Sequence, residues 1–161
     1  MINNHQNLRE LKEEDLDYLL EWRNDKKVKS FMHNSKNISK KEHTQWFYES
    51  KNNDFKHLLI YEELDEPIGF LQFLVDPIQN NAEWGFYKKP NAYRGVGMRM
   101  GKLGIETARR KLKVNKLTGI VKNSNKSSID FHIKLGFILV DNQLSPKSEY
   151  NMNDIHFEML L

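Results

Sequence analysis

The chain has 161 residues and a net charge of +3, and 39% of its residues are hydrophobic and 29% charged. These values suit a single globular domain spanning residues 1–161. The absence of cysteine excludes disulfides, thiolate catalysis and zinc–thiolate sites. The basic residues form no concentrated stripe, so the sequence does not predict nucleic-acid binding. No signal peptide or membrane-spanning apolar run can be found in the sequence, so we expect a cytoplasmic protein without a membrane partner.

The N-terminal half predicts one strand, two helices and a meander of strands. Leu8–Leu11 predicts a strand, and the helical spacing of leucines in Glu13–Asn24 predicts a helix. Ser39 and Glu42 fit a capping box, which predicts a second helix through about Ser50. Further strands are predicted at Leu58–Glu62, Ile68–Val75 and Ala82–Tyr87. Because only short turns separate these three strands, we expect them to pair antiparallel.

The C-terminal half alternates helices and strands. A long helix is predicted over residues 97–112, with an apolar face of Met98, Gly101, Ile105, Ala108 and Leu112. A second helix over Ser127–Leu135 ends at Gly136, which suits the left-handed position after a helix. Strands are predicted at Leu117–Val121, Phe137–Val140 and His156–Leu161. The predicted fold class is α+β, a three-layer αβα arrangement in which a mixed, mainly antiparallel sheet of about seven strands carries helices on both faces.

A glycine-containing turn opens the long helix. Its sequence is Tyr93-Arg94-Gly95-Val96-Gly97-Met98-Arg99-Met100-Gly101. Glycines at a helix N-terminus expose backbone N–H groups where the helix dipole is positive, which favours a phosphate. The turn is not a P-loop, because no Gly-Lys-Ser/Thr follows, and the preceding meander argues against a Rossmann fingerprint. Phosphate binding and simple local packing both remain open from these residues alone.

A second motif runs from Asn125 to Phe137 and ends in Lys-Leu-Gly-Phe. The two motifs, in this order and at this separation, resemble the GNAT superfamily of acetyl-CoA-dependent N-acetyltransferases, and the resemblance covers nearly the whole chain. The first motif departs from the family pattern at Arg99, where a small residue is usual. The second keeps Asn125 but has His132 where tyrosine is usual.

The resemblance implies acetyl-CoA as co-substrate and no metal. It places the CoA pyrophosphate on the N–H groups of Val96 to Met100, with added charge from Arg94. It places the pantetheine arm along the backbone of the segment from Phe86 to Lys88, where the Tyr87 N–H polarises the thioester carbonyl. Asn125 would hold the arm from the opposite wall. The cofactor-binding residues expected on this basis are Phe86, Tyr87, Lys88, Arg94, Gly95, Val96, Gly97, Met98, Arg99, Asn125 and Lys126, although Arg99 and Lys126 can equally be solvated surface charges.

Two side chains are candidates for proton transfer. By the resemblance, His132 takes the general-acid role and protonates the departing thiolate. The alternative is a histidine that simply packs on its helix. Glu83 is the candidate general base, because strand alternation puts it on one face with Gly85 and Tyr87. An exposed strand glutamate without a catalytic role is the alternative.

The segment Glu21-Trp22-Arg23-Asn24-Asp25 resembles a GNAT branch that acts on amino sugars attached to nucleotides, as in pseudaminic acid biosynthesis. The resemblance implies an acceptor such as a UDP-linked 4-amino-4,6-dideoxy sugar. Trp22 would stack on a sugar or uracil ring, Arg23 or Asn24 would contact phosphates, and Glu83 would face the amine.

Other functions remain open. An alternative within the same superfamily is an enzyme whose acceptor amine belongs to a protein N-terminus, a ribosomal protein or an antibiotic. The chain also fits a non-catalytic acyl-CoA-binding protein, an alternative that the substitution at His132 keeps open. A homodimer is compatible with the sequence. The histidines His33, His43, His57 and His156 have no metal-ligand spacing.

Overall fold

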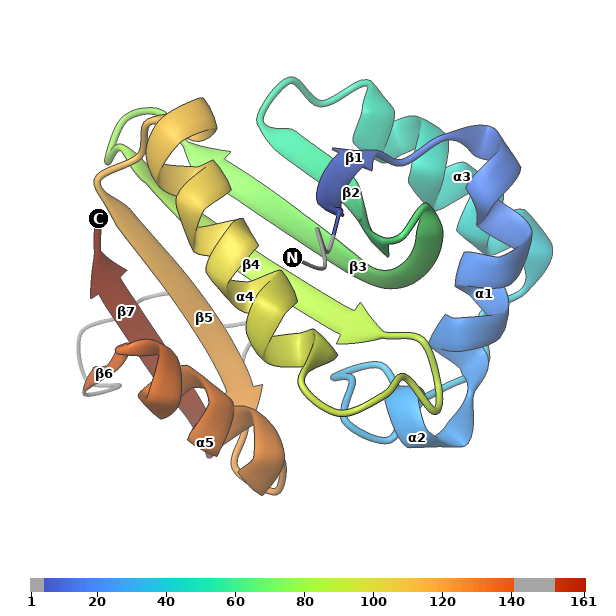
Figure 1. Cartoon of the computed structure of the whole chain (residues 1–161). Helices are drawn as coiled ribbons and strands as arrows, with labels where there is room; N and C mark the ends of the chain where they lie inside the picture. The colour runs from blue at the N-terminus through green and yellow to red at the C-terminus, as the bar shows by residue number, and fades with distance from the viewer. Residues whose placement is uncertain (1–4, 141–152) are drawn as a thin grey trace.

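The computed structural model describes residues 5–140 and 153–161. Its helices and strands follow one another along the chain as drawn in Figure 1. The strands are β1 (Gln6–Glu10), β2 (Lys56–Glu63), β3 (Glu66–Asp76), β4 (Asn81–Lys88), β5 (Lys116–Lys122), β6 (Ile138–Val140) and β7 (Asp154–Leu160). The α-helices are α1 (Leu16–Asn24), α2 (Lys26–Lys29), α3 (Lys40–Lys51), α4 (Val96–Thr107) and α5 (Lys126–Leu135).

The strands form one seven-stranded sheet in the order β1-β2-β3-β4-β5-β7-β6. Neighbouring strands pair antiparallel except β4 and β5, which pair parallel. A parallel pair needs a crossover, and α4 provides it. The mixed, mainly antiparallel sheet confirms the predicted fold class.

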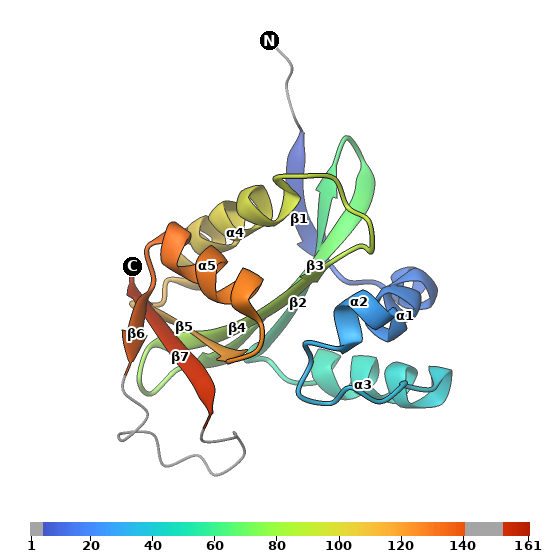
Figure 2. The same cartoon turned by 90° about the horizontal axis from the view of Figure 1, so that it is seen from below.

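Helices cover both faces of the sheet. Seen from below, α4 and α5 lie on one face, and α1, α2 and α3 lie on the other (Figure 2). Each face has its own apolar core, because successive side chains of a strand point to opposite faces. Trp84 and Phe86 of β4 pack with α4 and α5, whereas Tyr87 packs with the α1 and α3 side. The predicted alternation along this strand is therefore confirmed.

Local sequence signals place the helix ends well. The Ser39 hydroxyl accepts the Glu42 N–H at 3.2 Å, and the Glu42 carboxylate accepts the Ser39 N–H at 2.7 Å, as the capping box predicted. Gly136 follows α5 with φ = 98°, as predicted. The first predicted helix begins instead with a 3₁₀ turn, Glu13–Asp15, where Arg9 donates two hydrogen bonds to the Asp15 carboxylate at 2.7 and 2.8 Å.

The long helix differs from its prediction in two ways. It ends in a π-helical turn, Ala108–Leu112. Its buried face contains Met100 and Gly104, whereas Met98 is only partly buried. The sheet approaches Gly104 so closely that a Cβ atom there would lie 2.8 Å from the Leu71 side chain. Close packing of α4 on β3 and β4 therefore decides which residues of the helix are buried. The apolar pattern of the sequence alone does not show this.

Candidate active site

The two parallel strands at the centre of the sheet separate after three paired positions. Their register ends where Glu83 faces Thr118. Beyond this point β4 and β5 diverge, and α4 begins over the gap (Figure 1). A cavity of about 670 Å³ opens here, lined by both strands and by α4 and α5. The unpaired edge of β4 therefore faces a cavity, where an extended ligand can hydrogen-bond to it like an added strand.

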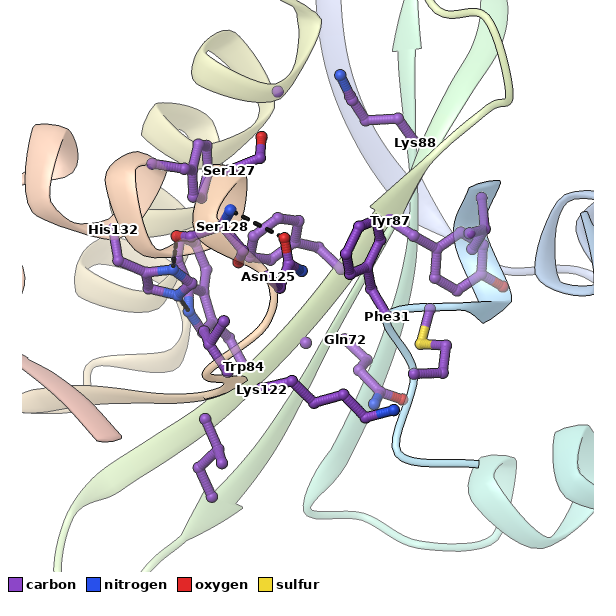
Figure 3. A pocket seen from close by; sticks show the side chains of 18 of the residues that line it. Phe31, Gln72, Trp84, Tyr87, Lys88, Lys122, Asn125, Ser127, Ser128 and His132 are labelled. Atoms are coloured by element: carbon purple, nitrogen blue, oxygen red, sulfur yellow. Dashed lines mark hydrogen bonds between the residues drawn. The ribbon is translucent and has the colours of Figure 1, made fainter. Parts of the chain in front are cut away.

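Side chains from separate elements meet in this cavity. Figure 3 shows Asn125, Ser127, Ser128 and His132 on one side and Phe31, Gln72 and Tyr87 on the other. Asn125 is the N-cap of α5, and its side-chain oxygen accepts the Ser128 N–H at 3.1 Å. The cap holds Asn125 at the cavity wall.

The predicted cofactor residues divide into two groups. Phe86, Tyr87, Lys88, Gly97 and Asn125 line the cavity. The other six do not line it: Arg94, Gly95, Val96, Met98, Arg99 and Lys126. Lys126 and Arg94 are exposed, and the Lys126 ammonium donates to Asn123 at 3.3 Å.

The start of α4 suits a phosphate group. Gly95 is its N-cap, with φ = 90° and no side-chain cap hydrogen bond, so the N–H groups of the first turn lack a side-chain acceptor. Gly97 faces the cavity, and a Cβ atom there would make only ordinary contact, 3.5 Å from the Lys88 side chain. These groups fit a pyrophosphate, with the unpaired edge of β4 next to them.

Arg99 points away from the cavity toward the end of β2. Its guanidinium hydrogen-bonds to the Glu63 carboxylate at 2.7 and 3.2 Å. Tyr61 and Tyr93 also donate hydroxyl hydrogen bonds to Glu63. Burial alone would raise the pKa of Glu63, but the hydrogen bonds from Arg99, Tyr61 and Tyr93 outweigh it and lower this pKa to about 2. The sequence marked Arg99 as unusual, but it did not reveal the partner.

His132 is 2% exposed, and both of its ring nitrogens are engaged. Its Nε2 accepts the Trp84 indole N–H at 3.1 Å, so Nδ1 carries the proton and donates to the Ser128 carbonyl at 2.7 Å. Burial lowers the pKa of His132, which favours the neutral ring. The general-acid role stays a prediction, and these contacts give His132 a structural role that competes with it.

Glu83 lies at the point where the strands separate, and it lines the cavity. It is half-buried on β4, next to Leu74 of β3 and Thr118 of β5. A carboxylate at this point is adjacent to the unpaired β4 edge. The general-base role of Glu83 stays a prediction.

A second cavity of about 380 Å³ lies on the α1 and α3 side of the sheet. The second cavity adjoins the first, because Gln72, Gly85, Phe86 and Tyr87 contribute to the lining of both. Arg23 lines the second cavity, and its role in acceptor binding stays a prediction.

Trp22 and Asn24 line neither cavity. Trp22 is 7% exposed and packs in the core beneath α1 and α3. The Asn24 amide donates to the Ile38 carbonyl and accepts the Ile38 N–H, each at 2.8 Å. A helical segment has buried and exposed faces, and the motif alone did not show that Trp22 and Asn24 point inward.

His43 lines the second cavity, and the sequence did not single it out as a candidate acceptor-site residue. It lies on α3 and is 4% exposed. Its Nε2 and the Arg23 Nη1 are buried without a hydrogen-bond partner. Burial and the nearby Arg23 lower the pKa of His43, and burial lowers that of Arg23. The helical spacing of His43, Phe47 and Ser50, which form the buried face of α3, is the sequence feature that indicates the burial of His43.

A mixed sheet that splits between parallel strands, with an uncapped helix start at the split, defines an acyl-CoA-dependent acyltransferase fold. Residues 6–138 match the acetyltransferase (GNAT) domain family, and the chain belongs to this family. It is an acetyltransferase that uses acetyl-CoA. A comparison with curated protein sequences found no match.

Solved structures share the fold at low sequence identity. Spermidine N-acetyltransferase from Vibrio cholerae, in complex with CoA and spermine, is 16% identical with a TM-score of 0.83 over 96% of this chain and 95% of that one. Campylobacter jejuni N-acetyltransferase PseH, in complex with acetyl coenzyme A, is 21% identical with a TM-score of 0.73 over 96% and 98%. AAC(6')-Ib, in complex with ribostamycin and coenzyme A, is 17% identical with a TM-score of 0.81 over 96% and 93%.

Residues 5–140 and 153–161 contain neither a metal-binding cluster nor a helix that could span a membrane. No group of three or more His, Asp or Glu side chains in these ranges is arranged to hold a metal ion. No helix there is long and apolar enough to cross a membrane.

We expect a Gly97→Val substitution to weaken CoA binding by more than about tenfold without unfolding the protein. The reason is that a Cβ at this position meets no close protein neighbour, so the added methyl groups project toward the cavity. Isothermal titration calorimetry with CoA measures the affinity, and Lys102→Ala, an exposed change on the same helix, is the control. Unaltered affinity would remove the start of α4 from the cofactor site.

We expect His132→Phe to lower the free energy of unfolding by about 1–3 kcal/mol, because the Trp84 N–H and the Ser128 carbonyl lose their partner. Urea unfolding measures this loss. Lys134→Ala, an exposed change on the same helix, should alter stability by less than about 0.5 kcal/mol. A variant with unchanged stability and greatly reduced turnover would instead support the general-acid role.

We expect the Glu63 cluster to make stability depend on acidic pH. Because the folded-state pKa of about 2 lies below the ordinary value of 4.5, the stabilisation is complete above pH 4.5 and is lost as the pH falls toward 2. Between pH 5.5 and 3, the wild type should lose about 2 kcal/mol more than Glu63→Gln. Urea unfolding of both proteins at the two pH values tests this, and equal losses would contradict it.

Proposed function

We propose that the chain transfers the acetyl group of acetyl-CoA to a primary amine on an anionic small molecule, and that the acceptor is a UDP-linked 4-amino-4,6-dideoxy sugar. The observation that carries the proposal is the Nη1 atom of Arg23, which is buried without a hydrogen-bond partner among the described residues and lies beside His43 in the second cavity, while Nη2 donates to the Asn34 carbonyl at 2.5 Å. A guanidinium without a counter-ion is costly to bury, and an anionic group of the acceptor would compensate it.

The charges around both cavities support an anionic acceptor. The basic residues that line them are Arg23, Lys27, Lys56, Lys88, Lys89 and Lys122. The acidic residues among the described lining are Glu42 and Glu83. Glu42 accepts hydrogen bonds from Ser39 as part of the α3 cap, and Lys89 is already paired with Glu66 at 2.8 Å, so an excess of basic over acidic groups remains along the lining. Spermine and ribostamycin, present in the V. cholerae and AAC(6')-Ib structures, are polycations, which this lining would repel.

Aromatic side chains give the second cavity flat walls. The aromatic residues that line it are Trp46, Phe70, Phe86 and Tyr87. The rings of Trp46 and Phe70 pack edge to face, with their centroids 5.9 Å apart. Such walls suit a uracil or sugar ring. We therefore assign the stacking role first expected of Trp22 to Trp46. The resemblance of Glu21–Asp25 to the nucleotide-sugar branch supports the same acceptor class.

The reaction follows from the arrangement along β4. Glu83 takes a proton from the acceptor ammonium, directly or through water, and frees the nitrogen lone pair. The nitrogen attacks the acetyl carbonyl carbon, whose oxygen is stabilised by the Tyr87 N–H. The C–S bond then breaks, the acetylated nitrogen loses its remaining extra proton to become the neutral amide, and the departing thiolate takes up a proton to leave as the CoA thiol. Since a thiol has a pKa near 8.5, the thiolate is a tolerable leaving group, and a proton from water suffices if His132 remains neutral and paired.

We expect turnover with UDP-4-amino-4,6-dideoxy-N-acetylaltrosamine and none with spermidine or an aminoglycoside at equal concentrations. Thiol release from acetyl-CoA, read with a chromogenic disulfide, measures it. A peptide amine and a reaction without acceptor complete the panel. Turnover restricted to the cationic amines would overturn the proposed acceptor class, and CoA binding without turnover on any amine would favour a non-catalytic acyl-CoA-binding protein.

We expect Arg23→Gln to raise KM for the nucleotide sugar about tenfold or more, as loss of a charge-assisted hydrogen bond predicts, with acetyl-CoA affinity unchanged. Lys26→Gln removes an equal charge from an exposed position three residues away and is the control. Equal effects of the two variants would reduce the role of Arg23 to long-range attraction.

A further inference from the structure

The cofactor turn is attached to the rest of the fold through one buried carboxylate. Glu63, the last residue of β2, is 4% exposed. Its carboxylate accepts hydrogen bonds from Tyr93 at the start of the turn, from Arg99 in α4 just after the turn, and from Tyr61 of β2. A single acidic group therefore joins the β2 end of the sheet to both sides of the turn.

The Arg99 side chain also packs directly against the residues of the turn. A Cβ atom on Gly95 would lie 2.6 Å from Arg99 Nη1, so the guanidinium lies directly against the Gly95 backbone. The same guanidinium lies over the Tyr93 ring, 5.6 Å from its centroid. The Arg99 N–H donates to the Gly95 carbonyl at 3.1 Å. Arg99 thus contacts the residues on either side of Arg94 while its charge is neutralised by Glu63.

This arrangement separates two roles that an arginine in a phosphate-binding turn can have. A direct ligand needs a guanidinium that faces the cavity, and Arg99 does not line it. Its donors at Nε and Nη2 are committed to Glu63. The N–H groups at the start of α4 remain for the phosphates, and they bind an anion well only when the turn holds them in a fixed orientation.

We propose that Arg99 and Glu63 form a clamp that positions the Tyr93–Gly97 turn to receive the pyrophosphate of acetyl-CoA, and that Arg99 does not itself contact the phosphates. The proposal rests on the assignment of acetyl-CoA to this turn. Arg99 replaces the small residue usual in the family and adds a rigid link to β2. Arg99 and Glu63 are positioning residues, not catalytic ones.

The two roles predict opposite effects of Glu63→Gln. In a clamp, loss of the carboxylate charge loosens the turn, so CoA should bind about five- to tenfold more weakly, as expected for loss of a net hydrogen bond to a charged group. If Arg99 were a direct phosphate ligand, the same change would free its charge for the phosphates and strengthen binding. Calorimetric titration with CoA at pH 7 measures the sign without requiring any acceptor.

A double-mutant cycle completes the test. We expect Arg99→Ala to weaken CoA binding by about the same factor as Glu63→Gln, and the double variant to be no weaker than either, because both remove one interaction. Arg99→Lys should recover only part of the affinity, since a lysine cannot form the two-point contact. Lys102→Ala, which removes an exposed cation from the same helix, should bind CoA like the wild type. Thermal unfolding of each variant identifies the temperature at which it is fully folded for titration.

The outcomes separate this proposal from the proposed function. If the wild type does not bind CoA, the assignment of the cofactor site fails. If the wild type binds CoA while folded Glu63→Gln binds equally well or better, or if the two losses add in the double variant, the clamp is overturned. Weaker binding in both single variants with no further loss in the double variant supports it, whatever the acceptor proves to be.

Discussion

The site depends on the point at which β4 and β5 stop pairing. After Glu83 and Thr118, the next positions in register are Trp84 and Gly119. The Trp84 indole and the His132 imidazole, joined by their hydrogen bond, both press on Gly119, where a Cβ atom would lie 2.8 Å from His132 and 2.9 Å from Trp84. Two rings packed at this junction therefore leave no room for a residue larger than glycine at position 119. The same two rings line the cavity beside the open β4 edge.

Alternation along β4 then separates the two substrates. Trp84 and Phe86 face α4 and α5, the side where the helix start and Asn125 favour the donor. Tyr87 faces the opposite side together with Arg23 and His43, where we propose that the acceptor binds, and Glu83 lines the first cavity. The backbone edge between the faces is the place where an acceptor nitrogen and a thioester carbon can meet. One strand can therefore hold both molecules without a hinge or a second domain.

The sequence predicted the elements that depend on short-range signals. The capping box at Ser39 and Glu42, the left-handed Gly136 and the alternation of β4 are set by neighbours within a few residues, and each is confirmed. The GNAT fold and the use of acetyl-CoA followed from two motifs read together. The contacts that give individual side chains their roles could not be predicted from the sequence, because they join residues that are far apart along the chain. Arg99 and Glu63 are 36 residues apart, and nothing in their spacing marks them as partners.

Long-range packing also explains why the predicted acceptor-binding residues do not lie together. Trp22, Arg23 and Asn24 are adjacent in sequence, but a helix turns successive side chains by about 100° and sends them to different environments. Trp22 packs in the core and Asn24 ties down Ile38, so Arg23 alone reaches the cavity. A motif specifies which residues are near one another along a helix, whereas burial decides which of them a ligand can touch. We therefore base the proposed acceptor on the buried Nη1 atom of Arg23 and not on the whole motif that contains it.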